Sequence, residues 1–275
     1  MADPRESPLA GRSIIVTRAS GQSRELCREL DARGARTIAL PMLRFALPEK
    51  TGSLDGTLRN LAQFDWWLLT SQNAIEFALL RGAEIGVKVA EAARGVRVAA
   101  VGPATAEAAR AAGLRVERVA HEHMGVKLAE EFAGDLRGKK VLLLRSDLAD
   151  SRLPAKLRGM GADVSDVIAY RTLPPGDQEL QALSEIRWSE AAAALFFSPS
   201  AVRHFVEAVG LPVLRREAKH LLFVAIGPVT LEAIREFGFE RAAQARDASV
   251  AAIVGALEEC LREAAARGFS GAQKR

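Results

Sequence analysis

The stretch Ala100-Val-Gly-Pro-Ala-Thr-Ala-Glu-Ala-Ala-Arg-Ala-Ala-Gly113 returns almost unchanged as Ala225-Ile-Gly-Pro-Val-Thr-Leu-Glu-Ala-Ile-Arg-Glu-Phe-Gly238. In each copy an apolar run predicts a strand, and the Gly-Pro pair predicts a turn into a helix, because proline fits the first helical position. The glycine at the end of each copy predicts the end of that helix. One strand-turn-helix unit therefore occurs twice in the chain.

The repeat extends beyond this unit, so the chain consists of two similar halves. Strands alternate with helices over residues 12–41, 64–132, 140–170 and 193–262, which predicts parallel sheets covered by helices on both faces. Trp66 and Trp67 are expected in one strand, with one of them facing the core. Three pairs of matching residues lie 127 positions apart: Arg18 and Arg145, Gly34 and Gly161, and Ser71 and Ser198.

Two groupings of these four segments satisfy the pattern. Either the first pairs with the second and the third with the fourth, or the middle two form one continuous domain and the outer two close a discontinuous one. Periodicity favours neither. In the second grouping the chain crosses between domains near residues 40–45 and 169–175, and the prolines at both crossings predict hinge motion of the two lobes.

Composition limits the classes of function. The chain has 275 residues, of which 49% are apolar and 26% charged, and no apolar run is as long as a membrane span. Without a hydrophobic signal region at its start, the protein is expected in the cytoplasm. Residues 1–10 and 266–275 are expected to form loose tails. Cys27 and Cys260 suit neither a disulfide framework nor a zinc site, and the net charge of +4 is too scattered for nucleic acid but compatible with an acidic small molecule.

Two threonines and the glycines before them are candidates for anion binding. Gly102 and Gly227 begin the two turns, and Thr105 and Thr230 lie in the first turn of the helices that follow. A hydroxyl there, beside unpaired backbone N–H groups and the positive end of the helix dipole, can hold a carboxylate or phosphate. The alternative is that each turn is only a helix cap.

Polar side chains mark the other predicted strand ends. Arg18 follows Thr17, and Arg145 ends the matching strand; either arginine could meet a carboxylate or be a solvated charge. Four further residues lie at strand-to-helix turns, where N-capping is the usual role, but the turns recur in both halves at the edge where ligands collect. These four are Ser71, Asn73, Ser198 and Ser200.

Tyr170 is the only tyrosine, and it lies at the end of a predicted strand just before Pro174. Its phenol could donate or accept a proton, or it could simply pack at the edge of the sheet. His121 and His123 have the spacing of a metal pair without a third ligand, so a solvated loop and no metal are predicted.

Seven segments, in order and over about residues 12–262, resemble uroporphyrinogen-III synthase. The resemblance implies two flavodoxin-like α/β lobes, 1–42 with 173–275 and 43–172, joined by a two-stranded connection. It also implies cyclisation of the linear tetrapyrrole hydroxymethylbilane, which carries eight carboxylates, to uroporphyrinogen III. This reaction inverts the last pyrrole ring through a spiro intermediate and loses water without a cofactor, in a protein expected to be a monomer. The segments are Val16-Thr17-Arg18, Leu69-Thr-Ser-Gln-Asn-Ala-Ile75, Ala100-Val-Gly-Pro-Ala-Thr105, Leu143-Leu-Arg145, Ala169-Tyr-Arg-Thr172, Phe197-Ser-Pro-Ser-Ala-Val202 and Ala225-Ile-Gly-Pro-Val-Thr230.

The resemblance also implies residue roles. The residue matching Tyr170 assists departure of the substrate hydroxyl, and those matching Ser71, Thr105, Ser198 and Thr230 surround the substrate. Thr17, Arg18, Asn73, Gly102, Arg145, Ser200 and Gly227 complete the expected substrate-binding set. Phe197 departs from the family pattern, which more often has threonine there. Gln72 departs from the internal repeat, whose second copy has Pro199.

Two other classes of function fit parts of the pattern. A non-catalytic two-lobed binder of anionic metabolites would explain the paired anion-ready turns, but no DNA-binding motif or secretion signal accompanies them. A nucleotide-dependent enzyme would fit the alternating strands and helices, but the sequence has no phosphate-binding loop.

Overall fold

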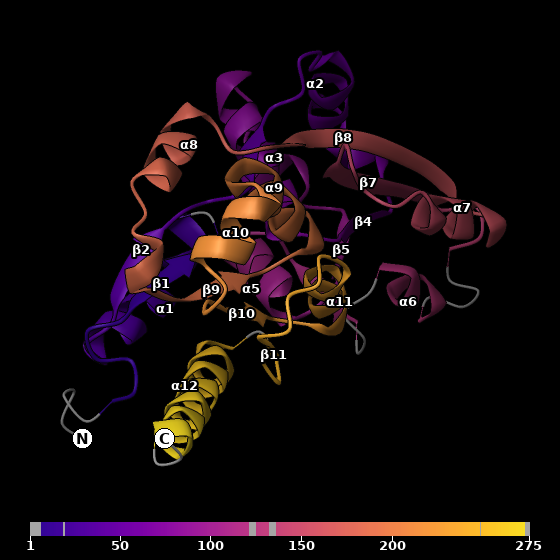
Figure 1. Ribbon diagram of the computed structural model, residues 1–275. Helices are drawn as coiled ribbons and strands as arrows, with labels where there is room; N and C mark the ends of the chain where they lie inside the picture. Colours follow the sequence, from indigo (N-terminus) through magenta and orange to yellow (C-terminus); the bar gives the residue numbers. More distant parts are fainter. Residues whose placement is uncertain (1–6, 19, 121–124, 132–135, 248, 273–275) are drawn as a thin grey trace. The chain divides into compact units, whose positions relative to one another are not determined.

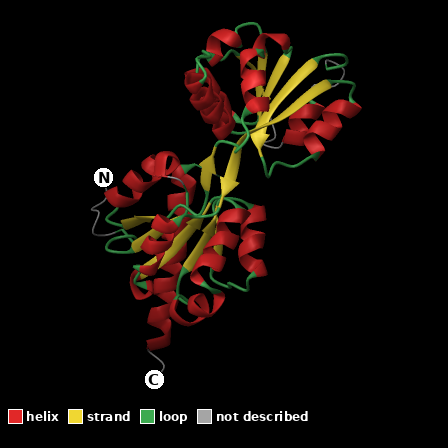
Figure 2. Ribbon diagram, turned by 90° about the horizontal axis from the view of Figure 1, so that it is seen from above, coloured by secondary structure: helices red, strands yellow, loops and turns green. Residues whose placement is uncertain are grey.

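The chain divides into two compact units in the computed structural model, which describes residues 7–18, 20–120, 125–131, 136–247 and 249–272 (Figure 1). Unit 1 is Met1–Arg44 with Leu173–Arg275, and unit 2 is Phe45–Thr172. Each unit has one sheet flanked by helices (Figure 2). The prediction of parallel sheets covered by helices is confirmed.

Unit 1 has a five-stranded sheet in the order β2-β1-β9-β10-β11, in which every pair is parallel. Numbered by appearance within the unit, this order is 2-1-3-4-5, that of flavodoxin-like folds. The strands are β1 (Ser13–Val16), β2 (Arg36–Ala39), β9 (Ala191–Phe196), β10 (Leu222–Ala225) and β11 (Ala242–Gln244); the helices are α1 (Ser20–Ala32), α8 (Asp177–Ser184), α9 (Pro199–Val209), α10 (Leu211–Glu217), α11 (Pro228–Glu236) and α12 (Val250–Ala272).

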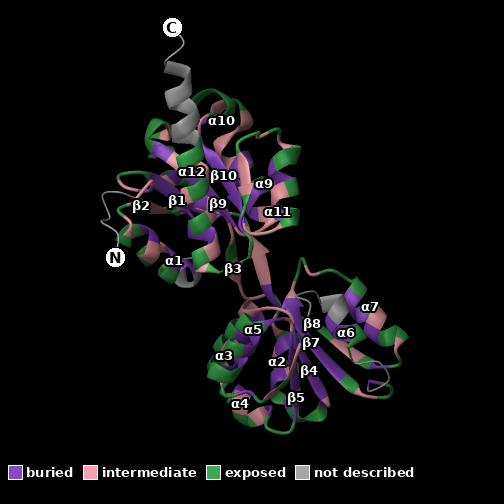
Figure 3. Cartoon of the chain, turned by 90° about the horizontal axis from the view of Figure 1, so that it is seen from below, coloured by how far each residue is buried: buried purple, intermediate pink, exposed green. Residues whose placement is uncertain are grey.

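Both faces of this sheet are buried, as Figure 3 shows by colour. Ile15 and Phe196 point to a cluster that α9 to α11 complete, with Phe205 stacked edge-on against Phe196. Ile14 and Leu195 point to the opposite cluster, which α1 and α12 complete. Burial on two faces explains why these strands are continuous apolar runs and do not alternate with polar residues.

Unit 2 has a six-stranded sheet in the order β3-β8-β7-β4-β5-β6. Without β3, the strands have the same spatial order as in unit 1, because β8 and β7 match β2 and β1 of the repeat. The order along the chain is circularly permuted, since β7 and β8 come after the other three. The strands are β3 (Arg44–Ala46), β4 (Trp66–Leu69), β5 (Arg97–Ala100), β6 (Val116–Val119), β7 (Lys140–Ser146) and β8 (Asp163–Leu173); the helices are α2 (Gly52–Arg59), α3 (Gln72–Glu84), α4 (Val89–Ala92), α5 (Pro103–Ala111), α6 (Gly125–Glu130) and α7 (Arg152–Gly159).

The two tryptophans of β4 show that this sheet is also covered on both faces. Trp67 lies in the cluster beneath α2 to α5, and Trp66 lies in the opposite cluster beneath α6 and α7. Both are almost fully buried, so the prediction that only one of them faces the core is wrong. A strand inside a doubly covered sheet has no solvent face.

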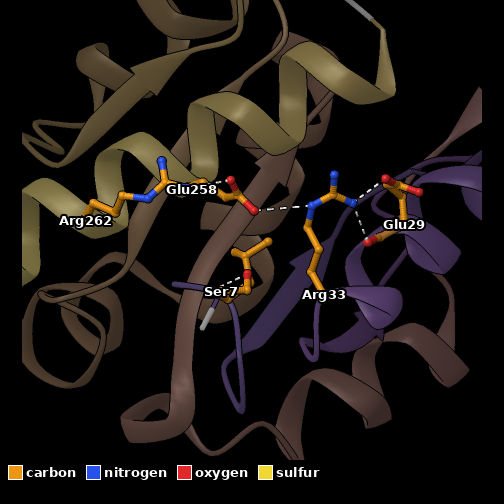
Figure 4. A network of polar contacts seen from close by, with 6 residues as sticks. Ser7, Glu29, Arg33, Glu258 and Arg262 are labelled. Atoms are coloured by element: carbon orange, nitrogen blue, oxygen red, sulfur yellow. Dashed lines mark hydrogen bonds and ion pairs between the residues drawn. The ribbon is translucent and has the colours of Figure 1, made fainter. Parts of the chain in front are cut away.

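Two expectations about the ends of the chain are wrong where the structure describes them, at residues 7–10 and 266–272; residues 1–6 and 273–275 lie outside the described residues. Leu9 is fully buried in the cluster under α1 and α12, although residues 1–10 were expected to be loose. The α12 helix continues to Ala272, through most of the expected C-terminal tail, although Gly268 and Gly271 in that part have low helix propensity. An ion pair joins α12 to the residue that follows α1: Arg33 Nε lies 3.2 Å from Glu258 Oε1 (Figure 4).

Within the described residues, no helix combines the length and apolarity needed to cross a bilayer.

Candidate functional site

In each unit the predicted site residues lie at the carboxyl-end side of the sheet. Most of them follow a strand, but Arg145 lies within β7, and β8 continues beyond Tyr170 to Leu173, so Tyr170 does not end its strand as predicted. The connections leave in opposite directions from β1 and β9 in unit 1, and from β7 and β4 in unit 2. In open parallel sheets, ligands bind outside the strand ends at this switch point. Unit 1 places Thr17, Arg18, Ser198, Ser200, Gly227 and Thr230 at this edge, and unit 2 places Ser71, Asn73, Gly102, Thr105, Arg145 and Tyr170 there.

Tyr170 contacts both polar and aromatic side chains of unit 2. Its hydroxyl lies 3.1 Å from Ser71 Oγ and also bonds the side chain of Asn73. Its ring stacks on Phe77 at 5.5 Å and meets Phe45 edge-on at 5.6 Å. Only 6% of the residue is exposed. The phenol is therefore held in one position by packing on its ring and hydrogen bonds at its tip.

Burial raises the pKa of Tyr170 above its ordinary value of 10.0. The hydrogen bonds with Ser71 and Asn73 oppose this rise, and the negative charge of Asp147 adds to it. The phenol is consequently protonated at neutral pH. It can donate a proton, and it can accept one only after it has donated its own.

The two matching serines cap their helices with the same geometry. Ser71 Oγ accepts a hydrogen bond from the backbone N–H of Ala74, and Ser198 Oγ accepts one from Ala201, both at 3.2 Å. Ser71 thus has two roles, since it also contacts the phenol. In unit 1 the position that matches Tyr170 is Leu43, so only unit 2 combines the capping serine with a proton donor.

Thr105 and Thr230 are buried at the starts of α5 and α11. They are 7% and 5% exposed, and each is the third helical residue after the capping glycine. Within the described part of the chain, neither hydroxyl has a hydrogen-bond partner. Each hydroxyl is therefore open to a ligand that accepts its proton at the start of the helix.

Thr17, Arg18 and Arg145 have protein partners. The Thr17 hydroxyl donates to the Leu195 carbonyl at 2.7 Å, which joins β1 to β9 at the switch point. Arg18 lies over the Phe197 ring at 5.2 Å, and burial lowers its pKa. Arg145 is only 7% exposed, and its guanidinium binds both carboxylate oxygens of Asp166, at 2.8 and 2.5 Å.

Arg145 also donates to the Asp150 carbonyl at 2.6 Å, so all three of its nitrogens have partners. The carboxylate that this arginine meets is therefore one of the protein's own. Its proposed contact with substrate stays a prediction, as do those of Thr17, Arg18 and Ser200.

The two capping glycines differ in backbone conformation. Gly102 has φ +95°, a region open only to glycine without strain, whereas Gly227 has φ −164°, which any residue adopts. A Cβ on Gly227 would have no neighbour within 4 Å.

We expect Gly102→Ala to lower the free energy of unfolding by about 1–3 kcal/mol, because alanine is strained at that φ. Gly227→Ala should change it by less than about 0.5 kcal/mol, since neither strain nor a clash results. Urea denaturation of both variants measures the difference. Equal losses of stability in the two variants would contradict the conclusion that only Gly102 has a backbone conformation that requires glycine.

Sequence reasoning missed Phe45 and Phe77, which fix the ring of Tyr170. Apolar residues in an apolar chain carry no signal by themselves. The repeat could have indicated one of them. Phe77 matches His204, and Tyr170 matches Leu43, so both residues of the Phe77–Tyr170 contact differ from their counterparts in the other half. His204 instead bonds the Met42 carbonyl at 2.9 Å. The predicted solvated loop with His121 and His123 lies outside the described residues.

Sequence comparisons give one consistent family. The model of the family described as "Uroporphyrinogen-III synthase HemD" matches residues 24–255. A uroporphyrinogen-III synthase of Synechococcus elongatus is 30% identical over 203 residues, which cover 74% of this chain and 76% of the relative. One from Chlorobaculum parvum is 24% identical over 231 residues, which cover 83% and 91% of the two chains.

Solved structures agree with this fold. A crystal structure of uroporphyrinogen III synthase from Thermus thermophilus matches with a TM-score of 0.61 at 19% identity, over 92% of this chain and 99% of that one. The Helicobacter pylori enzyme also matches with a TM-score of 0.61 at 19% identity, over 93% and 99%. At this identity the likeness concerns the fold.

Proposed function

We propose, since this chain belongs to the uroporphyrinogen-III synthase family, that Tyr170 is the proton donor that begins its reaction. The protein is a cyclising lyase, which closes hydroxymethylbilane to uroporphyrinogen III with inversion of the last pyrrole ring and loss of water. The observation that carries the assignment of Tyr170 is its buried phenol, held by Ser71 at the carboxyl edge of the unit 2 sheet.

The reaction begins with loss of the substrate hydroxyl group. The carbon–oxygen bond of the hydroxymethyl group breaks, and its electron pair leaves with the oxygen, which takes the phenol proton of Tyr170 and departs as water. The pyrrole nitrogen supplies the electrons that leave an azafulvenium cation. The substituted carbon of the last ring attacks this cation to give the spiro intermediate. A carbon-bound proton lost later in the rearrangement returns to the phenolate.

Tyr170 acts here as a general acid. Ser71 and Asn73 hold its hydroxyl, and they also lower the cost of the transient phenolate, because hydrogen bonds to the charged form favour it. The stacked ring of Phe77 keeps water away from one face of the phenol. The three side chains thus orient one proton donor without taking its proton.

The acid arms of the substrate are the proposed ligands of the two Gly-Pro turns. Thr105 and Thr230 are buried residues whose hydroxyls have no hydrogen-bond partner in the described residues, and they lie beside the first-turn N–H groups of a nine-residue helix. A carboxylate accepts from both kinds of donor, and the helix dipole adds to the attraction. We expect the substrate to be recognised through several of its eight carboxylates, without a cofactor, by a monomer in the cytoplasm.

The test of the activity is incubation with enzymatically made hydroxymethylbilane, followed by oxidation and separation of the porphyrin isomers. The type III isomer should dominate with the protein, and type I should dominate with buffer or heated protein, because the substrate closes without inversion in solution. Tight binding of the tetrapyrrole with only type I product would instead indicate a non-catalytic binder.

Replacing Thr105 or Thr230 by valine tests the carboxylate contacts. Valine keeps the shape but removes the hydroxyl, so each variant should raise KM roughly tenfold through loss of one hydrogen bond to a charged group. The measurement is KM for hydroxymethylbilane at low and high salt. A free energy of unfolding equal to or above the parental value is expected, since the hydroxyl has no protein partner in the described chain. Parental KM in both variants would contradict the role.

A further inference from the structure

We propose that Leu148 is a substrate-binding residue, whose side chain packs against the face of a pyrrole ring beside Tyr170. The inference rests on the proposed function and extends it from the acid arms to the apolar body of the substrate. Leu148 is 67% exposed, the highest value among the large apolar residues that the structure describes. It lies directly after β7, one of the two strands at the switch point of unit 2.

Leu148 is held in place by a set of hydrogen bonds centred on Ser146. The Ser146 hydroxyl donates to Asp147 Oδ1 at 3.0 Å, so it accepts at its oxygen from the Leu148 N–H at 3.2 Å. It also accepts from the Thr172 hydroxyl at 2.9 Å, because its only proton is already used. The backbone N–H of this exposed leucine is thus bonded to a hydroxyl that is itself held by two other side chains.

The same set of bonds fixes the distance from this loop to Tyr170. The Asp147 N–H donates to the Tyr170 carbonyl at 3.1 Å, and Asp147 Oδ1 accepts from the Thr172 N–H at 2.9 Å. The loop is therefore attached to β8 on both sides of the residue that follows Tyr170. These bonds would fix the position of a pyrrole ring on Leu148 relative to the backbone of Tyr170.

The chemistry of the substrate explains why an apolar residue belongs here. Hydroxyls and backbone N–H groups suit the carboxylates, but they provide nothing for the faces of four pyrrole rings. Covering a ring with a branched aliphatic side chain removes apolar surface of both from water. In unit 1 the position that matches Leu148 is Gly21, so this apolar contact, like the proton donor, belongs to one half of the repeat.

The test compares Leu148→Ala with Leu80→Ala. Leu80 is 50% exposed on α3, so its replacement removes the same atoms from the same unit away from the strand ends. Measurements are KM for hydroxymethylbilane, Kd for uroporphyrinogen III by equilibrium dialysis under nitrogen, and Tm. We expect Leu148→Ala to raise KM and Kd roughly tenfold, the effect of exposing a few methylene groups. Leu80→Ala should leave both constants unchanged.

Salt gives a second readout. Salt does not screen apolar contacts, so the factor by which Leu148→Ala raises KM and Kd should be the same at low and high salt. Leu148→Met keeps an apolar side chain of similar size, so its KM and Kd should lie much closer to the parental values than those of Leu148→Ala.

Parental constants in Leu148→Ala would overturn the inference. So would a fall in Tm larger than that of Leu80→Ala, because it would show that Leu148 packs on its own protein. The parental protein is assayed first with isomer analysis. Absence of the type III isomer at that stage refutes the proposed function, whereas an active parent with an unaffected Leu148→Ala variant refutes only the role of Leu148.

Discussion

Tyr170→Phe should lower the rate of uroporphyrinogen III formation by roughly 10²–10⁴-fold, the usual contribution of a general acid. The variant removes one oxygen and keeps the ring, whose stacking on Phe77 and edge contact with Phe45 do not depend on that oxygen. Folding should therefore be preserved. Because the hydroxyl of the substrate leaves readily in water, the assay must count the type III isomer and not total porphyrin.

Ser71→Ala is the matched control for this prediction. It removes the hydrogen bond at 3.1 Å from the phenol but leaves the proton donor itself, so its loss of rate should be much smaller than that of Tyr170→Phe. It also removes a helix cap, which should lower the free energy of unfolding by about 1 kcal/mol. A folded Tyr170→Phe protein that makes type III product at the parental rate would exclude the acid role and leave Tyr170 as a packing residue.

The dependence on pH follows from the direction of the pKa shift. The folded protein raises the pKa of Tyr170 above 10.0, so the phenol stays protonated from pH 7 to pH 9 and the rate should not fall in this interval through its ionisation. The folded state also holds this proton more tightly than the unfolded chain. Its contribution to stability is therefore complete below pH 10 and is lost as the pH rises through the raised value. Tyr170→Phe should remove that alkaline loss.

Arg145→Met should lower the free energy of unfolding by about 3 kcal/mol, because it breaks a mostly buried ion pair and leaves Asp166 without its partner. The Arg145 side chain is 8% exposed, and its guanidinium makes two hydrogen bonds to Asp166 and one to the Asp150 carbonyl. Asp166 itself is 26% exposed, which keeps the loss toward the lower end of the range for buried pairs. Urea denaturation monitored by tryptophan fluorescence gives the value.

Arg152→Met is the control for Arg145→Met. Arg152 also pairs with an aspartate, Asp150, but its side chain is 81% exposed, so its loss should change stability by less than about 0.5 kcal/mol. The double variant Arg145→Met with Asp166→Leu should recover part of the stability, since no unpaired carboxylate remains. An Arg145→Met protein of parental stability whose KM rises would instead assign Arg145 to the substrate.

The sequence by itself determined the fold class and the family. The two Gly-Pro repeats, the apolar runs of strand length and the 127-residue offset required parallel sheets with helices on both faces, because only that arrangement buries such strands on two sides. Family membership followed from the order of seven short segments, and the comparisons confirm it. The same pattern placed the polar candidates at strand ends, where the structure also has most of them.

Only the tertiary structure decided which partner each of those side chains has. Arg18 and Arg145 are equivalent in the repeat, yet one lies over Phe197 and the other is bound by Asp166. Gly102 and Gly227 are equivalent as well, yet only Gly102 has a backbone that excludes other residues. Sequence periodicity records burial and local conformation, whereas hydrogen bonds and ring contacts depend on residues from distant strands, as between Ser71 and Tyr170, 99 positions apart.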